Sequence, residues 1–230
     1  MVGSEPKARV ELIEHLAGSI ESVRRPHPLR VCLDGPDAAG KTTLADELAF
    51  VLRGRGHEVI RASIDGFHRP RAERYRRGEN SAEGYYEDSF DYAVLCSVLL
   101  DPLGPDGSRS YRRAVFDFRE DAPLLCPTTV ASEDAILVFD GVFLLRPELV
   151  EVWDFRIFVS VESDECLRRA LERDTALFGS RQEVERRYRN RYIHGQRLYF
   201  AAARPAEVAD AIVGNDDPVR PTLEVAVSKP

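Results

Sequence analysis

The chain has 230 residues, 43% of them apolar, which suits one globular domain with a full core and a small lid. Its formal net charge of −7 disfavours a nucleic-acid partner on electrostatic grounds. No apolar run approaches the roughly 20 residues that span a bilayer, no signal-peptide core is seen, and four scattered cysteines suit free thiols, so we expect a cytoplasmic protein without a membrane partner.

The first expected element is an amphipathic helix over residues 4–25. Ser4 is suited to cap it, and Pro6 falls in its first turn. We expect this helix to pack on the outside of the core and to carry no chemistry. Its apolar stripe consists of Val10, Ile13, Leu16, Ala17 and Ile20.

Residues 35–43 match the phosphate-binding pattern G-x-x-x-x-G-K-[ST] without a mismatch. Residues 29–34 before them are typical of a strand, and residues 42–53 after them of a helix. The glycines let successive backbone N–H groups face phosphate oxygens at the positive end of that helix. We therefore predict an ATP site with Mg²⁺, held by Gly35, Pro36, Asp37, Ala38, Ala39, Gly40, Lys41, Thr42 and Thr43.

Within this loop, Lys41 can reach the β- and γ-phosphates, and the Thr42 hydroxyl can bind Mg²⁺. Only three lysines occur, Lys7, Lys41 and Lys229, so 29 of the 32 basic residues are arginine. The one interior lysine stands in the phosphate loop, which supports a working site. A GTPase is disfavoured because no lysine lies in an N-K-x-D setting.

A second strand is expected over residues 57–64, and it delivers Asp65 to the edge of the sheet where open α/β folds bind ligands. Asp65 is our candidate to accept the proton of a substrate hydroxyl; the alternative is a turn-forming Asp-Gly pair. Residues 69–88 are polar and too long for a plain connection, so we expect an excursion that faces the substrate. Phe67, Tyr85 and Tyr86 are candidate substrate contacts there.

Residues 89–100 predict a helix, and residues 112–118 predict one arm of a hairpin. Asp117 could hold substrate hydroxyls, although a solvated strand edge explains it equally well. Residues 135–139 form an apolar run typical of a buried parallel strand, and it ends at Asp140, where a magnesium-linked carboxylate is expected. Another core strand is expected over residues 155–161.

Arginine-rich helices are expected over residues 163–178 and 181–203, joined at Gly179. Together they predict a lid that closes over nucleotide phosphates; the alternative is a solvated charged helix. A last strand is expected over residues 209–213, a turn that could sit by the nucleotide base over 215–218, and a short edge strand over 223–227. The lid candidates are Arg169, Arg173 and Arg181, of which Arg169 is placed with both the nucleotide and the substrate.

From about residue 29 to 218, the chain resembles the uridine kinase-like branch of the P-loop small-molecule kinases, which includes phosphoribulokinases and bacterial pantothenate kinases. The matching segments are the phosphate loop, Asp65-Gly66-Phe67, Asp88-Ser89-Phe90-Asp91, Phe116-Asp117-Phe118, Phe139-Asp140-Gly141-Val142-Phe143, Arg168-Arg169-Ala170-Leu171-Glu172-Arg173-Asp174 and Ala209-Asp210.

The resemblance implies an α/β, three-layer P-loop NTPase fold with a mainly five-stranded parallel sheet, a substrate-side hairpin excursion and an arginine-rich helical lid. We expect one domain over residues 1–230, with an N-terminal helix in 1–28, a core in 29–218 and the lid at about 163–203. The resemblance also implies transfer of the ATP γ-phosphate to a primary hydroxyl, with Asp65 as general base, Lys41 on the phosphates, Thr42 and Asp140 at Mg²⁺, and the three lid arginines.

Two departures concern the acceptor, and a third concerns the predicted metal site. Tyr85-Tyr86-Glu87 stands where uridine–cytidine kinases carry a Phe-Asp-His-Pro segment, and Arg119-Glu120-Asp121 follows Phe118 where they carry a histidine against the pyrimidine. The strand-end acid is Asp140, where glutamate is common. We expect a pyrimidine nucleoside as acceptor; pantothenate, a sugar or sugar phosphate, nicotinamide riboside and a non-kinase ATPase switch are the alternatives. Homo-oligomerisation stays open.

Overall fold

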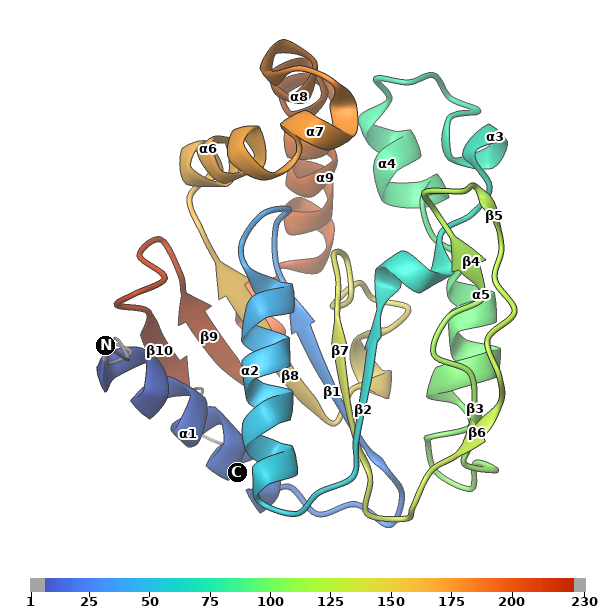
Figure 1. The fold of residues 1–230 in the computed structure, drawn as a ribbon, viewed down its shortest axis with the longest axis vertical. Coiled ribbons are helices and arrows are strands. Elements are labelled where there is room, and N and C mark those ends of the chain that lie inside the picture. The colour runs from blue at the N-terminus through green and yellow to red at the C-terminus, as the bar shows by residue number, and fades with distance from the viewer. Residues whose placement is uncertain (1–6, 226–230) are drawn as a thin grey trace.

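A central sheet organises the chain, and the computed structural model describes residues 7–225 of it. Its order is β10-β9-β8-β1-β7-β2 (Figure 1). The five strands from β9 to β2 are parallel, as predicted, and β10 pairs antiparallel with β9 at one edge. The strands are β1 (Leu29–Asp34), β2 (Val59–Ser63), β7 (Ile136–Asp140), β8 (Phe155–Ser160), β9 (Ala211–Gly214) and β10 (Thr222–Val225).

The neighbouring strands β1 and β7 are buried along their whole length, because helices cover both faces of the sheet. In β1, Val31 and Leu33 pack toward α1 (Lys7–Ser22) and α2 (Lys41–Gly54), whereas Cys32 packs toward the opposite layer. The opposite layer includes α5 (Tyr92–Leu95), η2 (Cys96–Leu100) and α9 (Ile193–Ala203). This alternation makes the predicted three-layer fold, which is confirmed.

Within the described residues, the N-terminal helix α1 covers Lys7–Ser22 and so ends three residues before the predicted end at Arg25. Leu16, Ala17 and Ile20 are fully buried as predicted, but Val10 is 39% exposed, and Leu12 lies in the apolar face. The expected cap and first-turn proline, Ser4 and Pro6, lie outside the described residues. No helix in residues 7–225 is long and apolar enough to cross a membrane.

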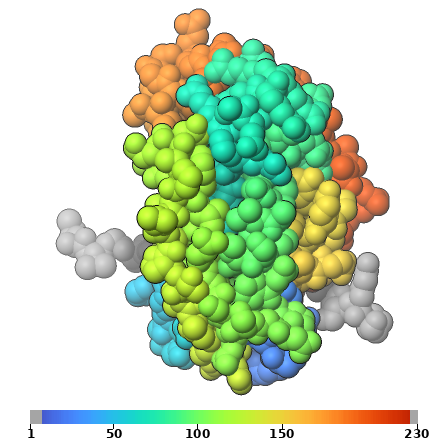
Figure 2. Space-filling view, turned by 90° about the vertical axis from the view of Figure 1, so that its right-hand side faces the viewer, coloured from blue at the N-terminus to red at the C-terminus, as the bar shows by residue number. Residues whose placement is uncertain are grey.

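The segment between β2 and β7 forms one wall of the molecule, coloured from teal to lime in Figure 2. The predicted hairpin is present, because β4 pairs antiparallel with β5, and β3 pairs in the same way with β6. The expected helix over 89–100 begins at Tyr92. The elements of this wall also include η1 (Ile64–Phe67), α3 (Arg71–Arg74), α4 (Ala82–Asp88), β3 (Ser110–Tyr111), β4 (Phe116–Asp117), β5 (Ala122–Pro123) and β6 (Thr129–Val130).

The arginine-rich region contains more breaks than the sequence suggested. The helix expected over residues 163–178 is interrupted at Asp174, and Gly179, at φ +85°, ends the second piece. Figure 1 shows α6, α7 and α8 above the carboxyl ends of the strands, whereas α9 descends behind the sheet. The helical elements after β7 are η3 (Val150–Val152), α6 (Ser163–Arg173), α7 (Thr175–Phe178), α8 (Arg181–Arg187), η4 (Tyr188–Tyr192), α9 and α10 (Pro205–Val208).

Candidate active site

The phosphate loop connects the end of β1 with the start of α2, as the motif predicts. Gly35 is required by packing, because a Cβ there would lie 2.3 Å from the carbonyl oxygen of Val159. Gly40 adopts φ +86° and forms the N-terminal boundary of α2. Both glycines therefore keep the backbone close to its neighbours, so the loop can present N–H groups to phosphate oxygens.

Lys41 lies across the loop that precedes it. Its ammonium donates to the carbonyl oxygens of Gly35, at 2.9 Å, and Pro36, at 2.6 Å, and the residue is only 8% exposed. These contacts hold the positive charge at the place where the motif puts the β- and γ-phosphates. The lysine is thus oriented by the loop itself and does not depend on a distant partner.

Thr42 and Asp140 meet at the carboxyl edge of the sheet. The threonine hydroxyl donates to Asp140 Oδ2 at 2.6 Å, and Asp140 is 2% exposed. The register of β7 places Asp140 opposite Leu33 of β1 and Ser63 of β2, so the acid lies between the two loops that carry the chemistry. A hydroxyl and a carboxylate are hard oxygen donors of the kind that Mg²⁺ uses beside nucleotide phosphates, so the pair fits that ion.

Arg61 was missed by sequence reasoning, although it stands in an otherwise apolar strand. Its guanidinium donates to Asp140 Oδ1 at 2.9 Å and also to the carbonyl oxygens of Ala62 and Val138. Asp140 is therefore held from two sides, by Thr42 and by Arg61. This arrangement fixes the direction of the Asp140 carboxylate.

We expect Arg61→Met to lower the free energy of unfolding by about 2–4 kcal/mol, because it leaves the buried Asp140 carboxylate without its cationic partner. Urea denaturation followed by circular dichroism measures this loss. Asp46→Asn is the matched control, since Asp46 pairs with the same guanidinium at 2.9 Å but its side chain is 64% exposed. The control should cost less than about 1 kcal/mol; equal losses would contradict the assignment.

Asp65 follows β2 in the short helix η1, on the same edge of the sheet. Its side chain is 61% exposed. The surrounding protein nevertheless displaces part of its hydration shell, and this desolvation raises the pKa of Asp65. The negative charges of Asp140 and Asp37 raise it further, and the nearby Lys41 and Arg173 offset part of the effect, leaving the pKa at about 6. A carboxylate with this pKa and an open face suits a general base near neutral pH.

His68 places a histidine beside Asp65 and the β4–β5 hairpin, a position that the sequence did not predict. Its ring packs against Phe90 and Phe118, with centroids 4.5 Å and 5.0 Å apart. Nδ1–H donates to the Asp65 carbonyl oxygen at 3.0 Å, and burial lowers the pKa of His68 to about 4. The imidazole is thus neutral, with Nε2 as its acceptor atom. His68 lies at neither of the two places where the resemblance predicts a histidine, before Asp88 and after Phe118.

The structure places the other predicted acceptor contacts less favourably. Phe67 is fully buried against Phe139, so it has no surface with which to touch an acceptor. Tyr86 is 8% exposed and packs between Phe143 and the Arg146 guanidinium.

Two more candidate acceptor contacts are engaged by other parts of the protein. Asp117 accepts from the N–H groups of Arg119 and Glu120, which is the role of a turn residue in its own hairpin. Tyr85 is 7% exposed and donates its hydroxyl to Asp37 Oδ2 at 2.5 Å. In this conformation, therefore, the Tyr85 hydroxyl is engaged with Asp37, and Asp117 uses only Oδ1 for its turn, so Asp117 stays a candidate contact.

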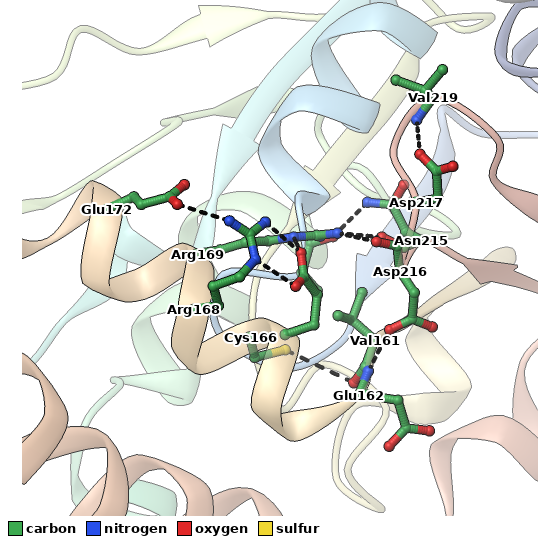
Figure 3. Close-up of polar contacts among 12 residues, drawn as sticks. Val161, Glu162, Cys166, Arg168, Arg169, Glu172, Asn215, Asp216, Asp217 and Val219 are labelled. Atoms are coloured by element: carbon green, nitrogen blue, oxygen red, sulfur yellow. Dashed lines mark hydrogen bonds and ion pairs between the residues drawn. The ribbon is translucent and has the colours of Figure 1, made fainter.

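The lid arginines differ in what they contact, as Figure 3 shows for Arg169. Arg169 donates to Glu165 and to the carbonyl oxygens of Asn215, at 2.7 Å, and Asp216, at 2.9 Å. Asn215 in turn donates to the Ala39 carbonyl oxygen at 2.7 Å. Arg169 thus joins α6 to the turn after β9 and, through Asn215, to the phosphate loop.

The remaining lid candidates lie on either side of this anchor. Arg173 pairs with Asp174 at 2.6 Å, its side chain is 60% exposed, and its charge reaches Asp65. Arg181 donates weakly to the Leu171 carbonyl oxygen, at 3.4 Å, and so supports the joint between α6 and α8. Of the three, Arg173 is the one whose charge acts on Asp65.

A buried acid, Asp34, fixes the base of the loop and was not singled out from the sequence. It is fully buried and accepts from the N–H groups of Gly35, at 2.8 Å, and Leu145, at 3.3 Å, and from the Tyr199 hydroxyl of α9. Burial raises the pKa of Asp34, and the Tyr199 hydrogen bond opposes that rise. The strand-end position was the only available signal, because nothing local points to Tyr199.

Comparisons with known proteins agree with this geometry. Residues 31–194 match the model of the phosphoribulokinase / uridine kinase family. Uridine-cytidine kinase B of Dictyostelium discoideum is 30% identical over 151 residues, which cover 65% of this chain and 60% of that protein. Uridine-cytidine kinase A of the same organism is 26% identical, and there the match spans 29% of the protein. The chain thus matches well under two thirds of these two relatives.

Solved structures share the fold at lower identity. A possible uridine kinase from Bacillus stearothermophilus superposes with a TM-score of 0.70 at 24% identity, covering 88% of this chain and 97% of that one. A D-glycerate 3-kinase from Cryptococcus neoformans superposes with a TM-score of 0.60 at 11% identity, covering 95% and 98%. The predicted resemblance is confirmed, and the chain belongs to the phosphoribulokinase / uridine kinase family.

Proposed function

We propose that the protein transfers the γ-phosphate of ATP to a primary hydroxyl of a small acceptor, with Mg²⁺ as cofactor. The observation that carries the proposal is the meeting of three parts at one edge of the sheet. These are the phosphate loop with Lys41, the Thr42–Asp140 pair, and Asp65 with a pKa of about 6. A phosphate-binding loop beside a free carboxylate is what transfer to an alcohol requires.

In the proposed reaction, Lys41 and the loop N–H groups hold the triphosphate and orient its γ-phosphorus. Asp65 accepts the proton of the acceptor hydroxyl as the acceptor oxygen forms its bond to phosphorus. The bond from phosphorus to the β,γ-bridging oxygen breaks, and ADP leaves with that oxygen. Arg173 can offset the charge that develops on the transferred group. Mg²⁺ on Thr42 and Asp140 would neutralise charge on the phosphate oxygens.

We propose a pyrimidine nucleoside as the acceptor, because the curated relatives are named uridine and uridine-cytidine kinases. A neutral imidazole at His68 and the ring of Phe118 would offer the base a hydrogen-bond acceptor and a flat apolar contact. Pantothenate, sugars, sugar phosphates and nicotinamide riboside are the other candidates. The free thiols of all four cysteines support a reducing, cytoplasmic location.

ATP consumption with Mg²⁺ against a panel of acceptors tests this proposal. The panel comprises uridine, cytidine, nicotinamide riboside, pantothenate, D-glycerate, ribose and ribulose 5-phosphate. We expect uridine or cytidine to raise the rate at least tenfold over the rate without acceptor. Stimulation by another member of the panel would support the kinase assignment and would identify that compound, instead of a pyrimidine nucleoside, as the acceptor. Slow hydrolysis that no member accelerates would favour an ATPase switch.

A further inference from the structure

Asp37 puts a carboxylate into the phosphate loop, three residues before Gly40. Its Oδ2 accepts from the Tyr85 hydroxyl of α4 at 2.5 Å and from the Gln196 amide of α9 at 2.8 Å. Both donors are 7% exposed, so they hold Asp37 from the protein side. Asp37 itself is partly exposed, and no group in residues 7–225 donates a hydrogen bond to its Oδ1.

This carboxylate lies between the acceptor side and the lid. Tyr85 belongs to α4 of the excursion, and Gln196 lies just beyond η4, the helical turn that continues the lid. Burial, followed by the charges of Asp140 and Asp37, raises the pKa of Asp65, so the charge of Asp37 is felt at the proposed general base. Asp37 therefore lies near Asp65, held between the excursion and the helix that follows the lid.

Phosphate cannot be the partner of the open oxygen. A carboxylate and a phosphate carry like charges and repel each other at hydrogen-bond distance. Oδ1 accepts hydrogen bonds and cannot donate them. Besides water and the nearby Arg173 guanidinium, the hydrogen donors that the proposed reaction brings to this place are hydroxyl groups of the acceptor.

We propose that Asp37 selects the acceptor: Oδ1 accepts a hydrogen bond from a second hydroxyl of an uncharged polyol, such as a nucleoside or a sugar, and the negative charge disfavours acceptors that carry a carboxylate or phosphate. The inference rests on the proposed kinase function and narrows its acceptor class. It makes Asp37 a specificity residue that stands inside the nucleotide loop but acts on the other substrate.

The test is Asp37→Asn, which keeps an oxygen for Tyr85 and Gln196 and removes the charge. Uridine, cytidine and ribose serve as neutral acceptors, and pantothenate and D-glycerate as anionic ones. We expect kcat/KM for the best neutral acceptor to fall about tenfold or more, mainly through the acceptor KM. The ratio of kcat/KM for this neutral acceptor to kcat/KM for the anionic acceptors should fall by a similar factor. KM for ATP should change less than about threefold. An acceptor that is not phosphorylated is measured by its inhibition constant.

Gln196→Met is the matched control, because it removes a donor to Asp37 and leaves the charge in place. For this variant, the ratio of kcat/KM for the neutral acceptors to kcat/KM for the anionic acceptors should stay within about twofold of the wild-type ratio. Asp37→Ser provides a second neutral loop if the asparagine variant does not fold, which thermal melting shows. It is expected to lose the same preference.

The outcomes separate this inference from the proposed function. If both Asp37 variants keep the wild-type preference and lose only ATP affinity or stability, Asp37 merely positions the loop and the inference is wrong. A wild-type enzyme that uses anionic acceptors as readily as neutral ones also contradicts it, while leaving the kinase intact. A wild-type enzyme that phosphorylates no acceptor overturns the proposed function, and this inference with it.

Discussion

Replacing Asp65 with asparagine is expected to lower kcat about 10²- to 10⁴-fold, which is the usual contribution of a positioned general base. The amide has nearly the same shape but cannot take the proton of the acceptor hydroxyl at neutral pH. KM for ATP should change less than about threefold, because the hydrogen bonds that Asp65 makes within residues 7–225 go to Ser63 and His68 and not to the phosphate loop. Steady-state kinetics with the best acceptor of the panel measure both constants.

Asp101→Asn is the matched control for this substitution. Asp101 is an exposed aspartate at the end of η2, and its carboxylate makes no hydrogen bond to any group in residues 7–225. The control removes the same charge and should leave kcat within about twofold of the wild type. An Asp65→Asn enzyme with wild-type turnover would show that Asp65 is only the turn residue of an Asp-Gly pair.

The pH dependence follows from the raised pKa of Asp65, about 6. The active form carries the carboxylate, so kcat/KM for the acceptor should rise about tenfold per pH unit below pH 6 and level off above it. An unperturbed aspartate would place this limb near pH 4. The limb should disappear in Asp65→Asn. A profile that is flat from pH 5 to 8 in the wild type would contradict the assignment.

Local patterns predicted the parts of the fold that depend on short stretches of chain. The strand before the phosphate loop and the helix after it were predicted because the motif fixes both. The apolar run that ends at Asp140 predicted a buried strand, and β7 is buried throughout. Asp65 and Asp140 could be placed on one edge because the strands are parallel, so their carboxyl ends meet.

The contacts that orient the site could not be predicted in this way. Asp34 and Tyr199 are 165 residues apart in the chain, and Asp37 and Gln196 are 159 apart. His68 reaches Phe118 only because η1 and the β4–β5 hairpin fold against each other. Periodicity reports which face of an element is buried, but it carries no information on which distant side chain lies opposite.

In the lid, the helical pattern of the sequence was correct, but the single helix it predicted over residues 163–178 is two helices, α6 and α7. An arginine-rich amphipathic helix was expected to run from residue 163 to 178, but Asp174 is 6% exposed and accepts hydrogen bonds from Arg173 and from Tyr188 of η4. These side-chain contacts accompany the break between α6 and α7. In the same region, Arg187 pairs with Glu79 of the excursion at 2.5 Å. The lid arginines thus serve contacts within the protein as well as the expected phosphates.

Replacing Lys41 with methionine is expected to reduce phosphate transfer at least about 10²- to 10³-fold, because the variant loses a cationic donor aimed at the charge of the transferred group. The fold should survive: the lost hydrogen bonds to Gly35 and Pro36 free two loop carbonyl oxygens and together cost about 1–3 kcal/mol. Product formation and urea denaturation measure the two effects separately. Arg53→Met removes a cation from the far end of the same helix and should leave turnover within about twofold. Wild-type turnover in the Lys41→Met enzyme would contradict the assignment of the phosphate loop to catalysis.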